Sequence, residues 1–226
     1  MSLIPSMGVD GAQIPGVTAE IYNPDQLIAG RFPLVTDSVT VTGAALLKRG
    51  SVLGQVTIGA AGAAVAGANT GNGTAGAVTV AANAQVGTYV LTATAATVFQ
   101  VVAPDGRRLA DLKTGIAYAD EIGLTLTAGG TAFVAGDSFT VAIGAGLGGF
   151  KLATSAATDG SQYPAAILVD TADASGGDVT GGIYIAGEFN VNALTFGAGI
   201  TAAAAKTALA ARGIYLKNAV SAADPS

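Results

Sequence analysis

Three residue types are missing from this chain of 226 residues: cysteine, histidine and tryptophan. Without cysteine the chain can form neither disulfides nor thiolate metal sites, and it has no cysteine nucleophile. Without histidine it lacks the most common general base and the most common metal ligand. Charged residues are also scarce, at 11% of the chain against about 25% in typical domains. These absences disfavour an enzyme and a metal site.

Positive charge is in short supply as well. The formal net charge is −5, and the tightest basic groups are the pairs Lys48-Arg49 and Arg107-Arg108. Nucleic-acid binding needs clustered lysine and arginine to neutralise phosphates, so we expect no direct nucleic-acid contact. The longest apolar run, 59–68, is about half of the ~20 residues that a membrane span needs, and no signal peptide is visible at the N-terminus. We therefore expect no membrane association.

What the chain does have is small residues and short β-like segments. Half of it is hydrophobic, and it contains 33 glycines. Short segments in which apolar residues alternate with polar or small ones recur along the chain, which is typical of half-buried strands. Turn signals such as Pro104-Asp105-Gly106 separate them. The segments with strand character are 38–42, 52–56, 89–93, 99–101, 124–127, 139–143, 163–169, 183–185 and 214–216.

One helix is expected near the C-terminus, over residues 202–212. The segment is alanine-rich, and alanine has the highest intrinsic helix propensity. Thr201 can cap its first turn, and Gly213 stands where a left-handed C-terminal cap belongs. The sequence thus predicts a mainly β protein with one short C-terminal helix.

Two glycine-rich stretches divide the chain into blocks. We interpret 59–68 as a flexible linker and Gly144–Gly149 as a second glycine hinge. Residues 59–148 would then be an inserted small β-sandwich domain, because they contain several short strands at close spacing. The flanking blocks, 21–58 and 149–226, would form one discontinuous domain.

Residues 1–20 are expected to form an extended N-terminal arm, because proline and glycine break any periodicity there. One interpretation is a disordered tail, the usual state of a terminus. The other is a segment that becomes ordered on a partner. Polarity alone selects the apolar residues that would make that contact: Leu3, Ile4, Ile14, Val17 and Tyr22.

The candidate chemical motifs are weak. Gly144, Gly146 and Gly149 match a dinucleotide-binding spacing, but a strand-like segment follows where a helix is required. Asp170, Asp173 and Asp178 lack the spacing of a calcium loop, so solvated turn residues are the favoured interpretation. Asp120 and Glu121 are adjacent, and adjacent strand residues point to opposite faces. We therefore expect no catalytic residues, no cofactor and no metal.

Outside the middle block the sequence resembles the lambda-type bacteriophage head decoration (capsid cement) family. The matching segments follow the family's order along the chain and cover about half of it. They are LIAG (27–30), FPLVT (32–36), LKRGSVLG (47–54), ATDGSQ (157–162), AIL (166–168), DV (178–179), YIAGEFN (184–190), ALTFG (193–197) and GIYL (213–216). The departure is the intervening block of some ninety residues, which simpler members do not have.

The resemblance implies a β-rich core of β-tulip or β-clip type and assembly into homotrimers. It also implies attachment of the trimers to the outside of the expanded head, where they would stabilise it against DNA pressure. The partner would be the major capsid protein, against which the N-terminal arm would become ordered. The expected location is the virion exterior, after assembly in the host cytoplasm. An alternative is an adhesin or carbohydrate-binding module in the middle block, where Tyr89, Phe99, Tyr118, Phe133 and Phe139 supply the aromatic side chains.

Overall fold

The computed structural model describes residues 26–218, and β-strands dominate them. This confirms the predicted mainly β class with one short helix near the C-terminus. The 3-10 helix η2 spans Val191–Ala193 and the α-helix α1 spans Ala202–Ala210. The strands are β1 (Val35–Val41), β2 (Leu46–Leu47), β3 (Val52–Gln55), β4 (Ile58–Ala61), β5 (Val65–Ala66), β6 (Thr74–Ala75), β7 (Thr79–Val80), β8 (Gly87–Ala95), β9 (Val98–Val102), β10 (Leu112–Lys113), β11 (Tyr118–Ala119), β12 (Ile122–Leu124), β13 (Leu126–Thr127), β14 (Ser138–Ala145), β15 (Phe150–Leu152), β16 (Pro164–Leu168), β17 (Ala172–Asp173), β18 (Val179–Asn190) and β19 (Ile214–Lys217).

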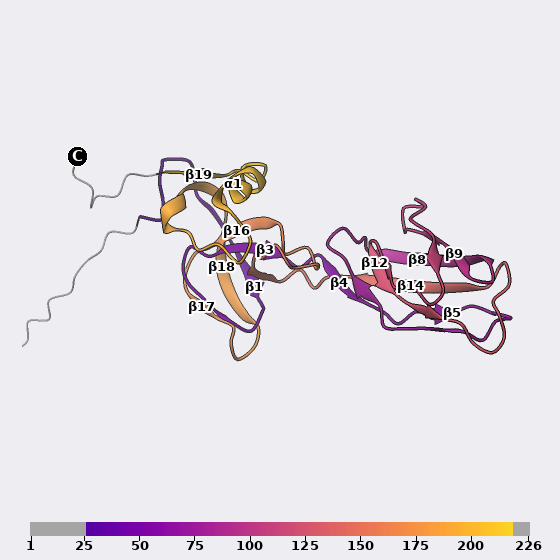
Figure 1. Ribbon diagram of the computed structural model, residues 1–226. Coiled ribbons are helices and arrows are strands. Elements are labelled where there is room, and N and C mark those ends of the chain that lie inside the picture. Colours follow the sequence, from indigo (N-terminus) through magenta and orange to yellow (C-terminus); the bar gives the residue numbers. More distant parts are fainter. Residues whose placement is uncertain (1–25, 219–226) are drawn as a thin grey trace, which may run out of the picture.

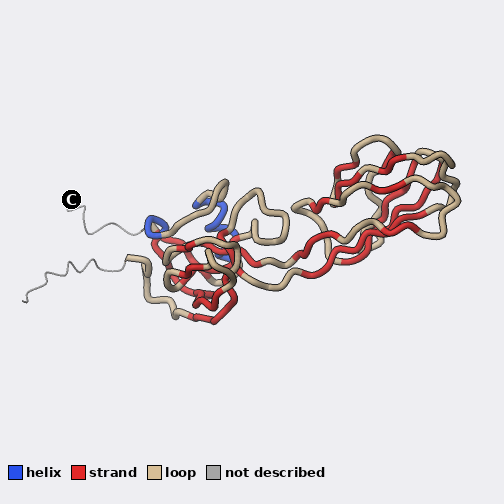
Figure 2. The backbone as a smooth tube through the Cα atoms, turned by 90° about the horizontal axis from the view of Figure 1, so that it is seen from below, coloured by secondary structure: helices blue, strands red, loops and turns tan. Residues whose placement is uncertain are grey.

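The molecule is elongated and has two lobes (Figures 1 and 2). We call residues 26–57 and 146–218 the proximal lobe, because both ends of the described chain lie there. We call residues 58–145 the distal lobe. None of the helices described between residues 26 and 218 is long and apolar enough to cross a membrane.

A closed ring of strands forms the centre of the proximal lobe. Its order is β1-β15-β3-β16-β18, and the ring closes because β1 also pairs with β18. Only the β1–β15 pair is parallel within the ring. Outside the ring, β19 pairs in parallel with the C-terminal end of β18, with Gly187 opposite Ile214. A closed ring leaves few unpaired strand edges, and unpaired edges are where sheets of different molecules tend to pair and aggregate.

β18 is much longer than the sequence suggests. The sequence predicts strand character only over 183–185, but β18 begins at Val179 and runs through Gly181 and Gly182 to Asn190. Glycine is needed at position 181 for packing rather than for a turn, since a Cβ there would lie 2.8 Å from the Cγ2 of Val41. Gly181 therefore allows the side chain of Val41 on β1 to approach β18 closely.

The helix covers one side of the ring. Ala205 and Leu209 are its buried residues, and they join a cluster that contains Val52, Ile167 and Phe189. The predicted cap is present: the Oγ1 of Thr201 accepts a hydrogen bond from the backbone N–H of Ala204 at 3.2 Å. The helix ends at Ala210, and Gly213 then takes a positive φ of 83° before β19 begins.

The distal lobe is built on the sheet β10-β9-β8-β14-β4, with β5 also pairing with β14. Two small sheets, β11-β12-β7 and β13-β6, contribute to the same hydrophobic core. Tyr89, Phe99, Phe133 and Phe139 lie at its centre and are at most 2% exposed. The prediction of a flexible linker over 59–68 is wrong. This segment forms most of β4 and all of β5, because its backbone pairs along the edge of β14.

The neck between the lobes is a hydrogen-bonded ladder. The N–H of Gly146 donates to the carbonyl of Thr57 at 2.9 Å, and the N–H groups of Thr57 and Ile58 donate to the carbonyl of Asp159 at 2.9 and 3.0 Å. The Nε2 of Gln162 in the proximal lobe donates to the carbonyl of Ala82 in the distal lobe at 3.0 Å. The glycines from 144 to 149 are thus part of a paired neck rather than of a free hinge.

Candidate functional site

The five arm residues selected from polarity, Leu3, Ile4, Ile14, Val17 and Tyr22, lie outside the described residues 26–218. The described chain starts beside the C-terminal half of β18. The N–H of Asn190 donates to the carbonyl of Leu27 at 2.8 Å, and the N–H of Ala29 donates to the carbonyl of Glu188 at 2.9 Å. Leu27 is buried at 2% exposure. The segment that follows the arm is therefore fixed to the proximal lobe.

Residues 29–34 bend around the carboxylate of Glu188. Oε1 of Glu188 is 2.6 Å from Nζ of Lys217, and the backbone N–H groups of Arg31 and Phe32 also donate to the carboxylate. The ion pair with Lys217 is the main reason why the pKa of Glu188 is below its usual value. A side chain at Gly30 would displace this carboxylate, since a Cβ there would lie 1.5 Å from Oε2 of Glu188. The carboxylate of Glu188 thus fixes the conformation of residues 29–34.

Apolar side chains are exposed on this loop and on the strands beside it. Phe32 is 41% exposed and Tyr215 is 42% exposed, and their rings meet edge to face with centroids 5.4 Å apart. We call the exposed apolar set of this region the entry surface. Its members are Ile28, Phe32, Leu34, Val35, Ile185 and Tyr215.

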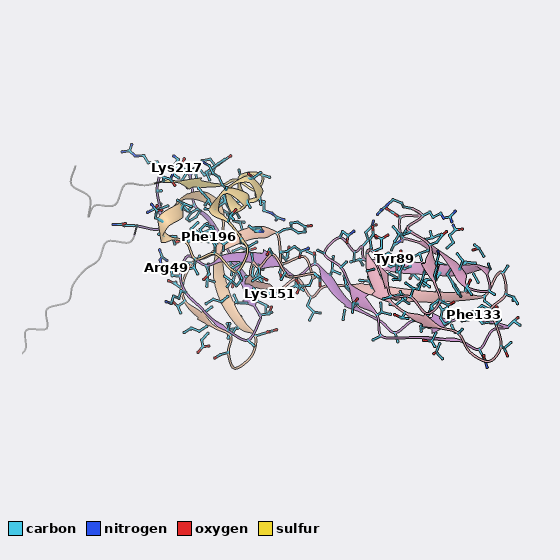
Figure 3. All side chains as sticks on the ribbon, viewed as in Figure 1. Arg49, Tyr89, Phe133, Lys151, Phe196 and Lys217 are labelled. Carbon is cyan, nitrogen blue, oxygen red and sulfur yellow. The ribbon has the colours of Figure 1, made fainter. Side chains whose placement is uncertain are left out.

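A groove of about 460 Å³ opens next to this aromatic pair. Figure 3 places Lys217, one of its residues, at the end of the molecule opposite Phe133 of the distal lobe. Exposed apolar side chains beside a groove are typical of a surface that binds another protein. The groove is lined by Phe32, Glu188, Lys206, Ala210, Tyr215, Leu216 and Lys217.

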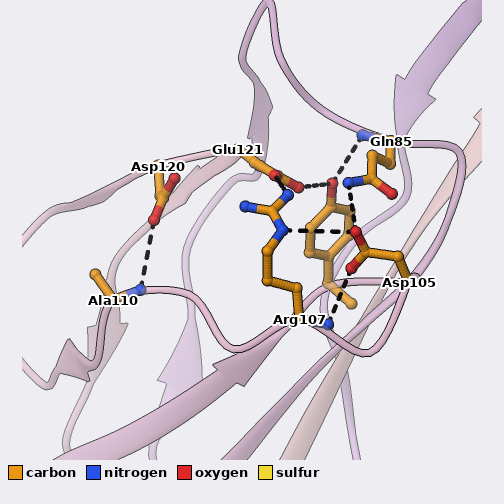
Figure 4. A network of polar contacts seen from close by, with 7 residues as sticks. Gln85, Asp105, Arg107, Ala110, Asp120 and Glu121 are labelled. Atoms are coloured by element: carbon orange, nitrogen blue, oxygen red, sulfur yellow. Dashed lines mark hydrogen bonds and ion pairs between the residues drawn. The ribbon is translucent and has the colours of Figure 1, made fainter.

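A second polar cluster lies in the distal lobe (Figure 4). Glu121 is 2% exposed, and its Oε2 accepts a hydrogen bond from the hydroxyl of Tyr89 at 2.7 Å. Its Oε1 is paired with the guanidinium of Arg107, which also lies 3.5 Å from Oδ2 of Asp105. The N–H of Gln85 donates to the Tyr89 hydroxyl at 2.8 Å. Every oxygen of the Glu121 carboxylate has a partner, so this cluster supports the fold.

Asp120 does not join that cluster. Its Oδ2 accepts a long hydrogen bond, 3.5 Å, from the N–H of Ala110. Both residues lie in the turn between β11 and β12 rather than in a strand, contrary to the prediction, and the side chain of Glu121 is buried whereas Asp120 is only partly buried. The two carboxyl groups therefore do not converge on a common substrate.

The buried tyrosines give the distal lobe a defined pH response. Burial, with added repulsion from Glu121, raises the pKa of Tyr89 to about 12, and burial also raises the pKa of Tyr118. An unfolded tyrosine ionises near pH 10, so the unfolded chain loses these protons first. The stabilisation is complete below about pH 10 and is lost as the pH rises through the folded pKa. We expect the melting temperature of the distal lobe to fall steeply above about pH 10.

Thermal unfolding followed by circular dichroism between about pH 8 and pH 11.5 would measure this, with tyrosinate absorbance as a second signal. Tyr89→Phe should weaken the alkaline decline while leaving the neutral-pH fold intact. A melting temperature that stays constant to pH 11.5 would contradict the assignment.

The other candidate motifs have structural roles. The strand β15 follows Gly149, so no helix N-terminus is available for a pyrophosphate. Asp170 lies 3.6 Å from Arg49, and Asp173 accepts hydrogen bonds from Ser175. Within residues 26–218, no group of three or more carboxylates could hold a metal ion.

The aromatic side chains of the distal lobe point into its core. Tyr118 has the largest exposure among the five, at 8%. Sugar binding by stacking needs an exposed ring face, and these rings pack on one another instead. The geometry therefore does not favour the carbohydrate-binding alternative.

The role of Glu188 in holding residues 29–34 was missed by the sequence analysis. The only available signal was a charged residue between Gly187 and Phe189 in an otherwise apolar strand. Its partners, residues 30–32 and Lys217, are distant in the chain, so no local pattern could connect them.

Comparison with known proteins places the chain in a family. The family model described as bacteriophage lambda head decoration protein D matches residues 78–214, which is more than half of the chain. The match starts just before β7 in the distal lobe and ends at the first residue of β19. No curated protein matches significantly.

Among solved structures, two crystal forms of Xanthomonas campestris FlgL, H3 and C2, share 23% identity with the chain. The matched regions are 43% and 45% of this chain. In both cases they span 33% of the FlgL chain. The TM-score is 0.31 for both, so this likeness carries no argument about fold or function. The family match does, and by it the chain belongs to the bacteriophage lambda head decoration protein D family.

Proposed function

We propose that this protein is a capsid cement protein that binds the outside of the expanded phage head as a homotrimer. Bound there, it stabilises the head against the pressure of the packaged DNA. The observation that carries the proposal is the family match over residues 78–214. Its partner is the major capsid protein, and its location is the virion exterior after assembly in the host cytoplasm.

The proximal lobe is the part that would contact the shell. It carries the entry surface, and the first described residue, Gln26, lies there. The arm of residues 1–20 would continue from this point along the capsid, with Leu3, Ile4 and Ile14 among its contacts. An extended arm can add a strand to a neighbour's sheet and gain backbone hydrogen bonds.

The distal lobe would project from the shell. Residues 58–145 form their own core, and Figure 1 shows this lobe at the far end of the molecule from the described chain ends. We propose that it is the inserted domain of residues 59–148, joined to a core of residues 21–58 and 149–226. Contact with the shell through the proximal lobe leaves it free to face solvent.

Cementing a shell needs distributed contact and no catalysis. A standard interface buries roughly 1,600 Å², and only part of the gain from burial remains after the cost of association. Three arms on one trimer engage together, so moderate contacts add up through avidity. A trimer that spans adjacent capsid subunits therefore resists their separation.

The test is binding to expanded, undecorated heads of the parent phage. We expect the full chain to elute as a trimer in size-exclusion chromatography with light scattering, and to sediment with the heads. Deleting residues 1–20 should reduce the affinity at least tenfold, because each arm contributes to an avid attachment. DNA-filled heads should also release their DNA at a higher temperature when the protein is bound. Undiminished binding of the deletion variant would reject the role of the arm, and failure of the full chain to sediment would reject the function.

A further inference from the structure

The groove beside the entry surface is basic, although the chain as a whole is acidic. Its lining contains Lys206 and Lys217 but only one acidic residue, Glu188. Glu188 is already neutralised by Lys217, with Oε1 and Nζ 2.6 Å apart. In the described part of the chain, Lys206 forms no ion pair. The lining of the groove therefore has a net positive charge, carried by Lys206, although the whole chain has a net charge of −5.

The rest of the groove is aromatic and aliphatic. Phe32 and Tyr215 form one wall with their edge-to-face rings, and Leu216 and Ala210 add apolar surface. Lys206 projects from α1, one turn before Ala210, so its charge stands at the rim of the apolar part. A ligand that fits must therefore present a negative group next to an apolar one.

The loop that presents Phe32 is held in place before any partner arrives. The carboxylate of Glu188 accepts hydrogen bonds from the backbone N–H groups of Arg31 and Phe32, and Gly30 lies directly against this carboxylate. A preorganised surface loses less conformational entropy on binding than a mobile one. The groove is thus a formed receptor rather than a flexible patch.

We propose that this groove binds an acidic segment of the major capsid protein. A carboxylate of that segment pairs with Lys206, and an adjacent apolar side chain packs against Phe32 and Tyr215. The occupant is argued from charge complementarity, because basic groups on an acidic protein select and orient an acidic partner. This inference rests on the proposed function, since it names the chemistry that the capsid side must supply.

Charge reversal at Lys206 tests the groove without disturbing the fold, because the side chain is exposed and has no ion pair to lose. Expanded, undecorated heads of the parent phage are the probe. We expect Lys206→Glu to weaken binding at least tenfold and to flatten its dependence on salt, whereas Lys206→Arg should bind normally. The matched control is Lys113→Glu, the same charge change at an exposed site on β10 of the distal lobe, which should bind as the unmodified chain does.

Zero-length carbodiimide cross-linking on the decorated heads identifies the partner. We expect Lys206 to be joined to an aspartate or glutamate of the major capsid protein. Cross-links only to carboxylates of this chain, such as Asp10, Glu20, Asp25 or Asp224, would overturn the proposal in favour of a self-contact. Normal binding by Lys206→Glu would also overturn it while leaving the proposed function standing. If the unmodified chain fails to bind the heads, both fall together.

Discussion

Replacing Gly54 with valine should unfold the proximal lobe. Gly54 lies in β3 between β15 and β16, and a Cβ there would be 2.0 Å from the carbonyl oxygen of Ser161 and 2.6 Å from its carbonyl carbon. These are backbone atoms, so no side-chain rotation can relieve the clash. We expect a loss of more than about 4 kcal/mol, a large part of the total stability of a typical domain.

The backbone around Ser161 cannot move away from Gly54 to make room for a side chain. Ser161 is fully buried, and Oδ1 of Asp159 accepts hydrogen bonds from its N–H at 3.1 Å and from its hydroxyl at 2.6 Å. Oδ2 of Asp159 is in turn 2.5 Å from Nζ of Lys151 on β15. The turn that approaches Gly54 is therefore anchored to the ring.

Thermal and urea unfolding, followed by circular dichroism, would measure the effect. Gly176→Ala is the matched control, since a Cβ at that position meets nothing within 4 Å. We expect the control to melt within a degree or two of the unmodified chain, because a surface change without contacts shifts stability by at most about 0.5 kcal/mol. A Gly54→Val protein that melts with its control would disprove the close approach.

Replacing Phe99 with alanine should destabilise the distal lobe by about 3–5 kcal/mol and leave the proximal lobe unchanged. Phe99 is fully buried, and its ring centroid lies 5.0 Å from that of Phe133 and 6.0 Å from that of Phe139. The core cluster that contains it draws only on residues of the distal lobe. The cavity left by the phenyl ring would therefore lower the stability of the distal lobe and not that of the proximal lobe.

Differential scanning calorimetry should show one transition moving to lower temperature while the other stays in place. Hydrogen exchange resolved by peptide would assign the shifted transition to residues 58–145. Val90→Ala is the control on the same sheet, because Val90 lies on β8 with 37% of its surface exposed. If both transitions moved equally, the two lobes would have to unfold as one cooperative unit.

Sequence reasoning succeeded where the signal is local. The alanine run and Thr201 predicted α1 within two residues, and the strand predicted over 163–169 contains β16. Each of these follows from the chemistry of one residue and its immediate neighbours.

It failed where distant segments decide the structure. The sequence indicates a strand only over 183–185, but Gly181 and Gly182 also belong to β18 because β1 pairs with them in the ladder. The segment 59–68 looked like a linker because its composition is bland, yet the edge of β14 gives it a partner. The Glu188 loop was missed for the same reason, as it joins residues 30–32 to Lys217. The domain boundaries and the arm contacts remain predictions.

The neck has a practical consequence for engineering. The polypeptide leaves the ring at Thr57 and returns at Gly146, two residues whose backbones are joined by a hydrogen bond of 2.9 Å. A guest module needs only two adjacent antiparallel ends to be spliced at this point, so its size imposes no strain on the ring. An enzyme or antigen with such ends, grafted in place of residues 58–145, would be displayed on the outside of a phage head.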